Sequence, residues 1–268
     1  MMNRLLLMIG VLLFFCGCTE CNCENCENCI CPNETPEEAV VEVIEFEDPL
    51  VKSICVAYWD TDNDNELSYE EAAAVSSMGG VFAYKSISTF NELQYFTGLK
   101  AIEENTFLGC KQLTSIVLPE EVTIIGDNAF PGCFNLESVH IENTEEFSYD
   151  DMGCYNLSKI WQIGQNAFSG CTKLKVVYLG ENLKKIEDAA FYNCNALQKV
   201  YIAAMTPPSI GEEVFYMTEE ITTVGGNSGW IGHPIYCTIY VPNDALDRYK
   251  SSWWSFGGNF VEYDFSQD

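Results

Sequence analysis

The sequence predicts an α/β solenoid, a stack of short coils joined by a parallel sheet, preceded by a small helical segment. A six-residue segment with Phe at its third position and Cys at its sixth recurs at residues 105–110, 128–133, 166–171 and 189–194, with an echo at Val214-Phe215. Two of the phenylalanine spacings are identical, 130 − 107 = 23 and 191 − 168 = 23 residues. A fixed period of this length is typical of solenoids, in which each unit buries its apolar side only against its neighbours.

Apolar residues at alternating positions follow each of these segments. A leucine three residues after the cysteine opens the pattern Leu-x-x-Ile/Val-x-Leu/Ile, as in residues 113–118 and 197–202. Because successive side chains of a strand point to opposite faces, this pattern predicts one short strand per coil with one buried face. The residue between the two apolar positions of each strand is expected to point outward. In a stack of coils these outward residues form a single column: Val117, His140, Trp161, Tyr178, Tyr201 and Tyr240.

Most of this outward column is aromatic or imidazole, and two interpretations of it stay open. An exposed aromatic stripe is typical of a binding site. Stacked aromatic side chains also stabilise neighbouring strands without binding a ligand. The candidate ligand-binding residues are His140, Trp161, Tyr178, Tyr201 and Tyr240. The third coil is irregular, because an acidic segment, residues 142–151, is inserted before it.

The cysteines of the repeats are predicted to be core residues. They occur once per coil at one repeat position, at Cys110, Cys133, Cys154, Cys171 and Cys194. Inside a stack a free thiol behaves as a small apolar group. In-register side chains point the same way, whereas a disulfide requires them to converge, so we expect free thiols.

Residues 60–71 match the loop of an EF-hand calcium site position by position. The expected calcium ligands are the side chains of Asp60, Asp62, Asp64 and Glu71 and the backbone carbonyl of Glu66. Asn65 stands where such loops have glycine, and Asn tolerates the left-handed conformation that this turn requires. The alternative is an acidic surface turn that holds no metal.

The sequences on both sides of this loop predict two short helices. Asp48-Pro49 supplies an N-cap and a first helical residue for an entering helix through Trp59. Ser68-x-x-Glu71 is a capping box that opens an exiting helix. Regulatory EF-hands usually occur in pairs and only one loop is visible, so we predict a weak, structural calcium.

The first residues have the pattern of an export signal. Arg4 precedes an apolar run, residues 5–15, that is too short to span a bilayer comfortably and is followed by Gly17-Cys18. This junction resembles the lipobox of bacterial lipoproteins. The resemblance implies removal of residues 1–17, lipidation of Cys18, and a lipid-anchored location at the bacterial outer membrane or cell surface. An ordinary secretory signal cleaved nearby is the alternative.

The mature chain is expected to be strongly acidic. The whole sequence has a formal net charge of −27, and removing residues 1–17 leaves 12 basic and 40 acidic residues, 12 − 40 = −28. Nucleic acid and bare anionic membrane are therefore very poor partners. Residues 19–51 contain ten acidic residues and no Lys or Arg, which predicts a flexible tether.

The tether contains a cluster of six cysteines: Cys18, Cys21, Cys23, Cys26, Cys29 and Cys31. Their spacing is faintly similar to that of the cysteines that bind a ferredoxin cluster. However, one residue separates the last two cysteines here, where the ferredoxin sequence has three. Outside the cytoplasm we rank disulfides first, a soft metal site second and an iron–sulfur cluster last.

The repeats resemble the BspA-like leucine-rich-repeat family of bacterial surface proteins. The resemblance lies in the Ala-Phe-x-Gly-Cys-x-x-Leu cores, in Ile124-Ile125-Gly126 and Ile163-Gly164, and in the closing sequence from Ile239 to Trp254. It covers about residues 81–268. It implies a right-handed leucine-rich-repeat solenoid with a parallel sheet on its concave side. It also implies adhesion or ligand binding at the cell surface, often to host or matrix proteins.

The predicted organisation has five parts: a lipoprotein signal peptide (1–17), a cysteine-rich acidic tether (18–47), an EF-hand-like helix–loop–helix (48–80), the solenoid (81–242) and a C-terminal cap (243–268). The leading function is a lipid-anchored, calcium-stabilised protein whose concave face binds an extracellular protein. A glycan-binding accessory for nutrient capture is the alternative. A secreted enzyme is a third class, which we do not predict, because His140 and His233 are the two histidines and no catalytic pairing recurs.

Overall fold

The computed structural model describes residues 41–141, 154–157, 159–222, 228–253 and 258–265. The predicted signal peptide, Cys18, the six tether cysteines and the acidic segment 142–151 lie outside these residues. Within the described ranges, no helix has the length and apolar character needed to cross a membrane.

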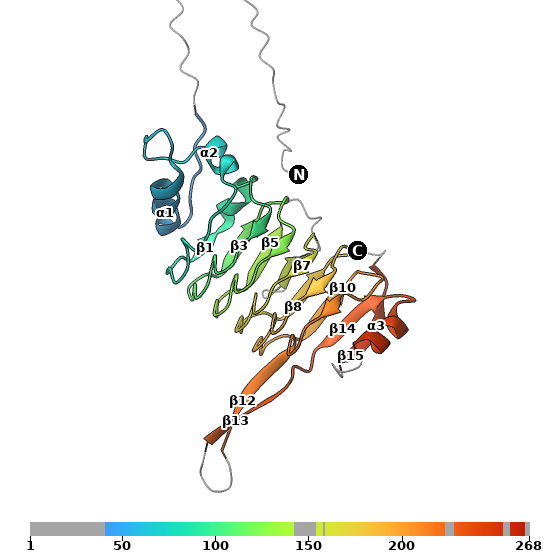
Figure 1. Ribbon diagram of the computed structural model, residues 1–268. Helices are drawn as coiled ribbons and strands as arrows, with labels where there is room; N and C mark the ends of the chain where they lie inside the picture. The colour runs from blue at the N-terminus through green and yellow to red at the C-terminus, as the bar shows by residue number, and fades with distance from the viewer. Residues whose placement is uncertain (1–40, 142–153, 158, 223–227, 254–257, 266–268) are drawn as a thin grey trace, which may run out of the picture. The chain divides into compact units, whose positions relative to one another are not determined.

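The repeats form a parallel-sheet solenoid, as the sequence predicts (Figure 1). Its larger sheet has eight strands in the order β1-β3-β5-β6-β8-β10-β14-β15, and all seven pairings are parallel. The strands are β1 Thr89–Phe90, β3 Ser115–Leu118, β5 Ser138–Ile141, β6 Cys154–Leu157, β8 Val176–Leu179, β10 Lys199–Ile202, β14 Thr238–Pro242 and β15 Asn259–Tyr263.

A second, narrower sheet follows the same coils. It consists of two-residue strands in the order β11-β9-β7-β4-β2. The strands are β2 Ala101–Ile102, β4 Ile124–Ile125, β7 Gln162–Ile163, β9 Lys185–Ile186 and β11 Ser209–Ile210. The second residue of each strand is an isoleucine, and in four of the five strands this side chain is buried. Each of these four coils therefore adds one buried isoleucine from the second sheet to the core.

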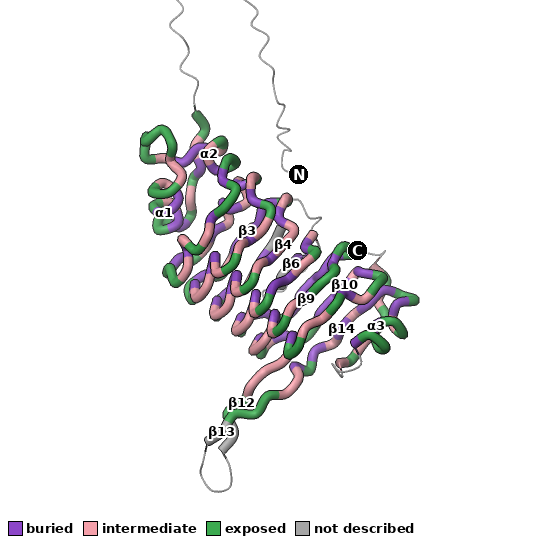
Figure 2. The backbone as a smooth tube through the Cα atoms, viewed as in Figure 1, coloured by how far each residue is buried: buried purple, intermediate pink, exposed green. Residues whose placement is uncertain are grey.

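The repeated phenylalanines form a continuous stack between the two sheets. The ring centroids of Phe107 and Phe130 are 5.1 Å apart, and those of Phe130 and Phe168 are 5.3 Å apart. The stack continues through Phe191 to Phe215 at 5.5 and 5.4 Å. All five rings are fully buried. Figure 2 shows the resulting pattern, in which buried and partly exposed stretches alternate along every coil.

The turn before each phenylalanine explains why asparagine recurs there. Asn105, Asn128 and Asn166 have φ angles of 60°, 51° and 54°. Asn enters this left-handed region more easily than other residues with a side chain. Ala189 makes the same turn, with a φ of 54°. The stack therefore tolerates at this position a residue that enters the left-handed region less easily than asparagine.

The predicted helix–loop–helix belongs to the same core as the repeats. It comprises α1 (Pro49–Trp59) and α2 (Tyr69–Ala74), and the 3-10 helix η1 (Asn91–Tyr95) follows β1. Trp59 contacts Phe96 edge to face at a centroid distance of 5.6 Å. Ile44 is also buried in this core, so folded structure begins before residue 48, inside the range predicted as tether.

The C-terminal cap covers the last coil with α3 (Leu246–Ser252) and adds β15 to the larger sheet. The buried Tyr249 hydroxyl donates to the carbonyl of Ala204 at 2.7 Å, and the indole N–H of Trp253 donates to that of Pro208 at 3.0 Å. The hairpin of β12 (Tyr216–Thr222) and β13 (Ser228–Pro234) projects from the array before β14 (Figure 1).

The third coil differs from the prediction. Cys154 does not join the other cysteines, because it is the first residue of β6 and pairs with Val176 in the larger sheet. Asn156, not Trp161, pairs with Tyr178 in the outward column. An extra strand of the larger sheet, β6, follows the inserted segment. Counting by the repeat period therefore assigns Trp161 to the outward column in place of Asn156. Trp161 precedes β7, where its N–H donates to the carbonyl of Thr123 at 2.9 Å.

Candidate functional site

The predicted calcium loop is held between the two short helices that the sequence indicates. Asp48 caps α1 by accepting from the N–H of Leu50 at 2.8 Å. Ser68 and Glu71 form the reciprocal capping box of α2. Asn65 has a φ of 67°, the left-handed conformation expected at this position. The two capped helices and the left-handed Asn65 agree with the sequence pattern, and the calcium site itself stays a prediction.

Three of the expected ligands face one another. Carboxylate oxygens of Asp60, Asp62 and Glu71 all lie within 4.8 Å of one another. The upper limit of these separations is close to twice the roughly 2.3–2.6 Å bond from calcium to oxygen. Asp64 lies outside this group, and its carboxylate accepts from the N–H of Glu66 at 2.7 Å. The carboxylate of Glu66 pairs with Lys52.

Glu71 is kept ionised by its neighbours. Burial disfavours the charged form, but the carboxylate accepts four hydrogen bonds from the N–H and hydroxyl groups of Ser68 and Thr61, at 2.6–3.0 Å. These bonds outweigh the burial and lower the pKa of Glu71 to about 2. A carboxylate that stays ionised is available to a cation over a wide range of pH.

A segment that the sequence analysis assigned to the tether pairs with the loop. Val43 and Ser68 form an antiparallel bridge, and the N–H of Ile44 donates to the carbonyl of Leu67 at 2.8 Å. The apolar residues Val41, Val43, Ile44 and Phe46, interspersed with Glu42 and Glu45, were the available sequence signal. The loop thus has a strand partner, although the described residues contain no second loop of this kind.

Three tyrosines of the predicted ligand-binding column form a stacked ladder on the outer face of the larger sheet. The rings of Tyr178 and Tyr201 are 4.5 Å apart and nearly parallel, at 9°. Those of Tyr201 and Tyr240 are 4.4 Å apart, at 10°. Tyr263 packs edge to face on both Tyr201 and Tyr240, and Phe265 packs on Tyr263. Neither Tyr263 nor Phe265 was among the predicted ligand-binding residues.

The ladder is less exposed than the sequence analysis expected. Tyr178 is 5% exposed and Tyr201 is 7% exposed, whereas Tyr240 is half-buried. Tyr178, Tyr201 and Val176 form an apolar cluster separate from the main core. The structure therefore favours strand stabilisation for Tyr178 and Tyr201, the second of the two interpretations left open above.

The other two candidates occupy different places. His140 lies in the column, opposite Val117 in the register of β3 and β5, but its side chain is outside the described residues. Trp161 is 38% exposed and lies beside the second sheet, where its carbonyl accepts from the N–H of Lys184 at 2.8 Å. Trp161 is therefore not a member of the ladder.

Parallel-paired coils, four of which carry one Phe and one Cys at fixed positions, define a repeat protein. The sequence model of the family described as "BspA type Leucine rich repeat region" matches six copies of the repeat, over residues 79–161 and 154–230. Together these ranges cover more than half of the 268 residues. The chain belongs to the BspA type leucine-rich repeat family. A comparison with curated proteins found no match.

Two solved structures show a similarity to this chain. A leucine rich cell surface protein from Faecalibacterium prausnitzii A2-165 is 18% identical over 54% of this chain and 53% of its own, with a TM-score of 0.22. A leucine-rich repeat protein from Bacteroides ovatus ATCC 8483 is 19% identical over 75% of this chain and 57% of its own, with a TM-score of 0.24. The aligned part thus spans just over half the length of each.

Proposed function

We propose that this chain is a lipid-anchored cell-surface protein that binds an extracellular protein through the outward face of its eight-stranded sheet. The observation that carries the proposal is the register of β10, β14 and β15. It places Lys199, Thr238 and Asn259 side by side in one row, and Tyr201, Tyr240 and Val261 in the next. Residues far apart in the sequence thus share one continuous surface, the arrangement by which repeat arrays bind partners.

The accessible part of this surface has the composition of an interface. Lys199 and Asn259 are exposed, Val261 is 37% exposed and Tyr240 is half-buried. The ladder below holds Tyr240 rigid, so little side-chain entropy is lost when a partner packs on it. We define Lys199, Tyr240, Asn259 and Val261 as the sheet surface. In this proposal the buried Tyr178 and Tyr201 support the surface, and Tyr240 contacts the partner.

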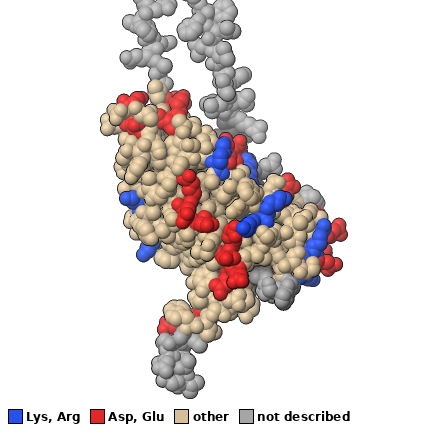
Figure 3. All heavy atoms as spheres, in the orientation of Figure 1, with Lys and Arg blue, Asp and Glu red and all other residues tan. Residues whose placement is uncertain are grey.

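The charges of the chain favour a partner whose surface is mostly basic. At the point where that partner contacts Lys199, it would carry an acidic or polar group. Acidic side chains form several separate groups on the face drawn in Figure 3, with basic side chains between them. At a net charge of −27, the field of the chain attracts a basic partner over long range. The ammonium of Lys199 would then pair locally with an acidic or polar group.

Calcium would stabilise this protein from the N-terminal end. The support for this part of the proposal is the arrangement of Asp60, Asp62 and Glu71, whose oxygens lie at calcium-binding separations. Because α1 and α2 share one core with the repeats, a cation in their loop would stabilise the whole array. The lipid anchor rests on the Gly17-Cys18 junction of the sequence.

The experiment that tests the function uses the full chain in a bacterial host. Wild-type protein is expected in the membrane fraction and, on intact cells, bound to immobilised fibronectin, laminin or collagen. Cys18→Ser should move the protein to the soluble fraction. Retention of the Cys18→Ser variant in membranes would reject the anchor. Failure of wild-type cells to bind these proteins above a strain without the protein would reject matrix-protein recognition.

A further inference from the structure

The β12–β13 hairpin is an insertion that the stack itself does not require. In the preceding coil, the first residue of β10 lies eight positions after Phe191, 199 − 191 = 8. The first residue of β14 lies 23 positions after Phe215, 238 − 215 = 23. The extra residues form two paired strands that project from the array. A feature that the repeat core does not need is a candidate for a function of its own.

The root of the hairpin is fixed to the last complete coil. The backbone N–H of Asn193 donates to the carbonyl of Tyr216 at 2.7 Å, and its side-chain oxygen accepts from the N–H of Thr218 at 2.8 Å. On the other strand, the N–H of Ile235 donates to the carbonyl of Phe215 at 2.8 Å. The hairpin root and the repeat turn at residues 195–198 therefore hold a defined geometry.

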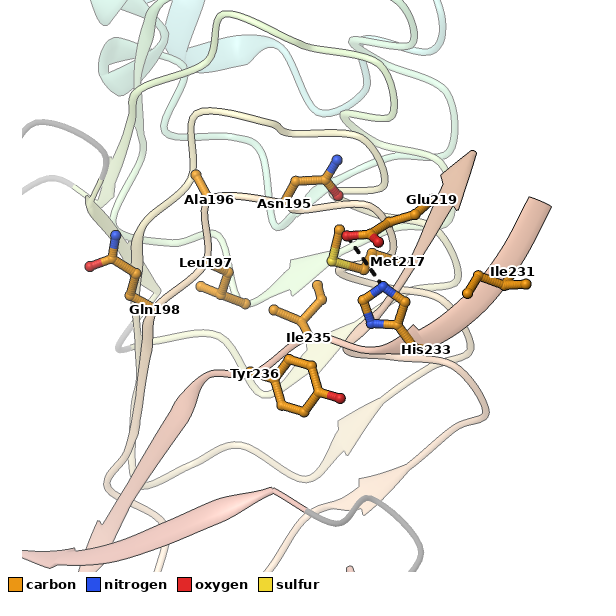
Figure 4. A pocket seen from close by; sticks show the side chains of 10 residues that line it. All are labelled: Asn195, Ala196, Leu197, Gln198, Met217, Glu219, Ile231, His233, Ile235 and Tyr236. Carbon is orange, nitrogen blue, oxygen red and sulfur yellow. Dashed lines mark ion pairs between the residues drawn. The ribbon is translucent and has the colours of Figure 1, made fainter. Parts of the chain in front are cut away.

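A depression of about 750 Å³ lies between this root and the repeat turn (Figure 4). This volume is within the range of small-ligand sites, about 300–1,000 Å³. Tyr236 lies at its border and is 89% exposed. The backbone on both sides of it is anchored, because its neighbours Ile235 and Cys237 are both buried. The fold thus presents an aromatic ring to solvent although the core makes no use of it.

Polar side chains of several kinds line the same depression. Asn195 and Gln198 come from the repeat turn, and Glu219 and His233 from the two hairpin strands. The His233 Nε2 lies 3.4 Å from a Glu219 carboxylate oxygen, and its Nδ1 lies 3.1 Å from the carbonyl oxygen of Pro234. The rings of His233 and Tyr236 are 6.0 Å apart, at 28°. In Figure 4 the amides of Asn195 and Gln198, which offer both donors and acceptors, come from the repeat turn, across the depression from the tyrosine ring.

We propose that this depression binds a neutral saccharide. A sugar presents apolar C–H groups on its ring faces and hydroxyl groups, each both donor and acceptor, around its edge. The ring of Tyr236 would pack against a sugar face, while the amides of Asn195 and Gln198 would hydrogen-bond the hydroxyls. An anionic sugar is disfavoured because Glu219 lines the site and the whole chain is strongly acidic. None of these residues belongs to the sheet surface, so the proposal is independent of the protein-binding function.

The test measures binding of hexasaccharides of glucose, mannose, galactose and xylose, with a heparin hexasaccharide as the anionic comparison, to the mature chain by calorimetry. At least one neutral hexasaccharide should bind the wild type, and Tyr236→Ala should weaken it at least tenfold. Gln198→Ala, which removes one amide, should weaken it several-fold. Tyr58→Ala is the matched control, because Tyr58 is 63% exposed on α1 and away from the depression. Circular dichroism checks that each variant is folded.

Three results would overturn the proposal: no neutral hexasaccharide binds the wild type, heparin binds more tightly than all of them, or a folded Tyr236→Ala binds as tightly as the wild type. If Tyr236→Ala instead loses binding to matrix proteins and keeps its sugar affinity, the hairpin root is a protein-docking surface and the saccharide assignment is wrong. If only variants of the sheet surface lose binding to matrix proteins, and sugar affinity is unchanged, the saccharide site stands.

Discussion

The thiol of Cys133 donates a hydrogen bond to the backbone carbonyl of Phe107, in the preceding coil, at 3.2 Å. The same carbonyl accepts the N–H of Cys110 at 3.2 Å. The bond recurs from Cys110, Cys171 and Cys194 to the phenylalanine carbonyl of the preceding coil, and Phe82 fills this role for Cys110. The Phe and Cys of the repeat therefore meet across coils, and each thiol links two neighbouring coils.

Removing one of these thiols should destabilise the array. Cys133→Ala loses the hydrogen bond and leaves a small cavity at a fully buried position, so the free energy of unfolding should fall by about 1–2 kcal/mol. Urea denaturation of the mature chain measures it. Gln112→Ala, at an exposed position of the preceding coil, is the control and should change stability by less than about 0.5 kcal/mol. Equal stabilities of the two variants would show that the thiol contributes nothing.

Stability should fall at alkaline pH. Burial raises the pKa of Cys110 from 9.0 to about 12, and burial also raises the pKa values of Cys133 and Cys194. A thiol whose folded pKa is raised stabilises the protein fully below pH 9, and this contribution is lost as the pH rises from about 9 towards 12. The melting temperature should therefore decline over this window, and Cys110→Ala should flatten the decline. An unchanged slope in that variant would contradict the assignment.

Calcium should raise the melting temperature of the whole chain. Binding to the folded state alone contributes about 2.7 kcal/mol at a hundredfold excess over Kd. Glu71→Ala is a poor test, because Glu71 also closes the capping box of α2. Asp62→Asn is sharper, since it keeps the shape of the side chain and removes one charge from the group of three. The calcium-induced shift should shrink in Asp62→Asn and persist in Asp247→Asn, an exposed acidic residue on α3. Identical shifts in both variants would reject the site.

The tyrosine ladder should contribute to stability through its rings. Tyr201 lies between Tyr178 and Tyr240 with both ring faces covered, so Tyr201→Ala should cost about 3 kcal/mol, the lower part of the range for large aromatic truncations. Tyr201→Phe keeps the ring and should retain most of the stability. Thermal unfolding of the two variants side by side measures the difference. If Tyr201→Ala melts within a degree of wild type, the ladder is not a structural element.

Repetition made most of this fold predictable. The 23-residue period places Phe107, Phe130, Phe168 and Phe191 in one stack, because a side chain at a fixed phase of a solenoid meets its own counterparts. The loop helices were equally predictable, since Asp48 and Ser68 cap their helices through hydrogen bonds to residues two or three positions away. Such local and periodic signals need no knowledge of distant contacts.

Other features depend on contacts that the sequence pattern does not contain. The alternation of a strand indicates that Tyr178 points away from the core, but not that Tyr201 will stack on it in a separate buried cluster. The place of Trp161 was wrong because an insertion breaks the period, and nothing local marks the extra strand β6. Ile44 is buried for a similar reason, since its partner Leu67 lies 23 residues further along the chain.

The central claim is that the sheet surface binds a protein partner, and a charge reversal tests it most directly. The measurement is the affinity of the mature chain for immobilised fibronectin, laminin and collagen by surface plasmon resonance. Lys199→Glu changes an exposed residue at the centre of the surface, and Lys100→Glu makes the same change at an exposed site near the second sheet. We predict that Lys199→Glu weakens the binding at least tenfold, while Lys100→Glu leaves it within twofold of wild type. Equal affinities of the two variants for a matrix protein that the wild type binds would contradict the account.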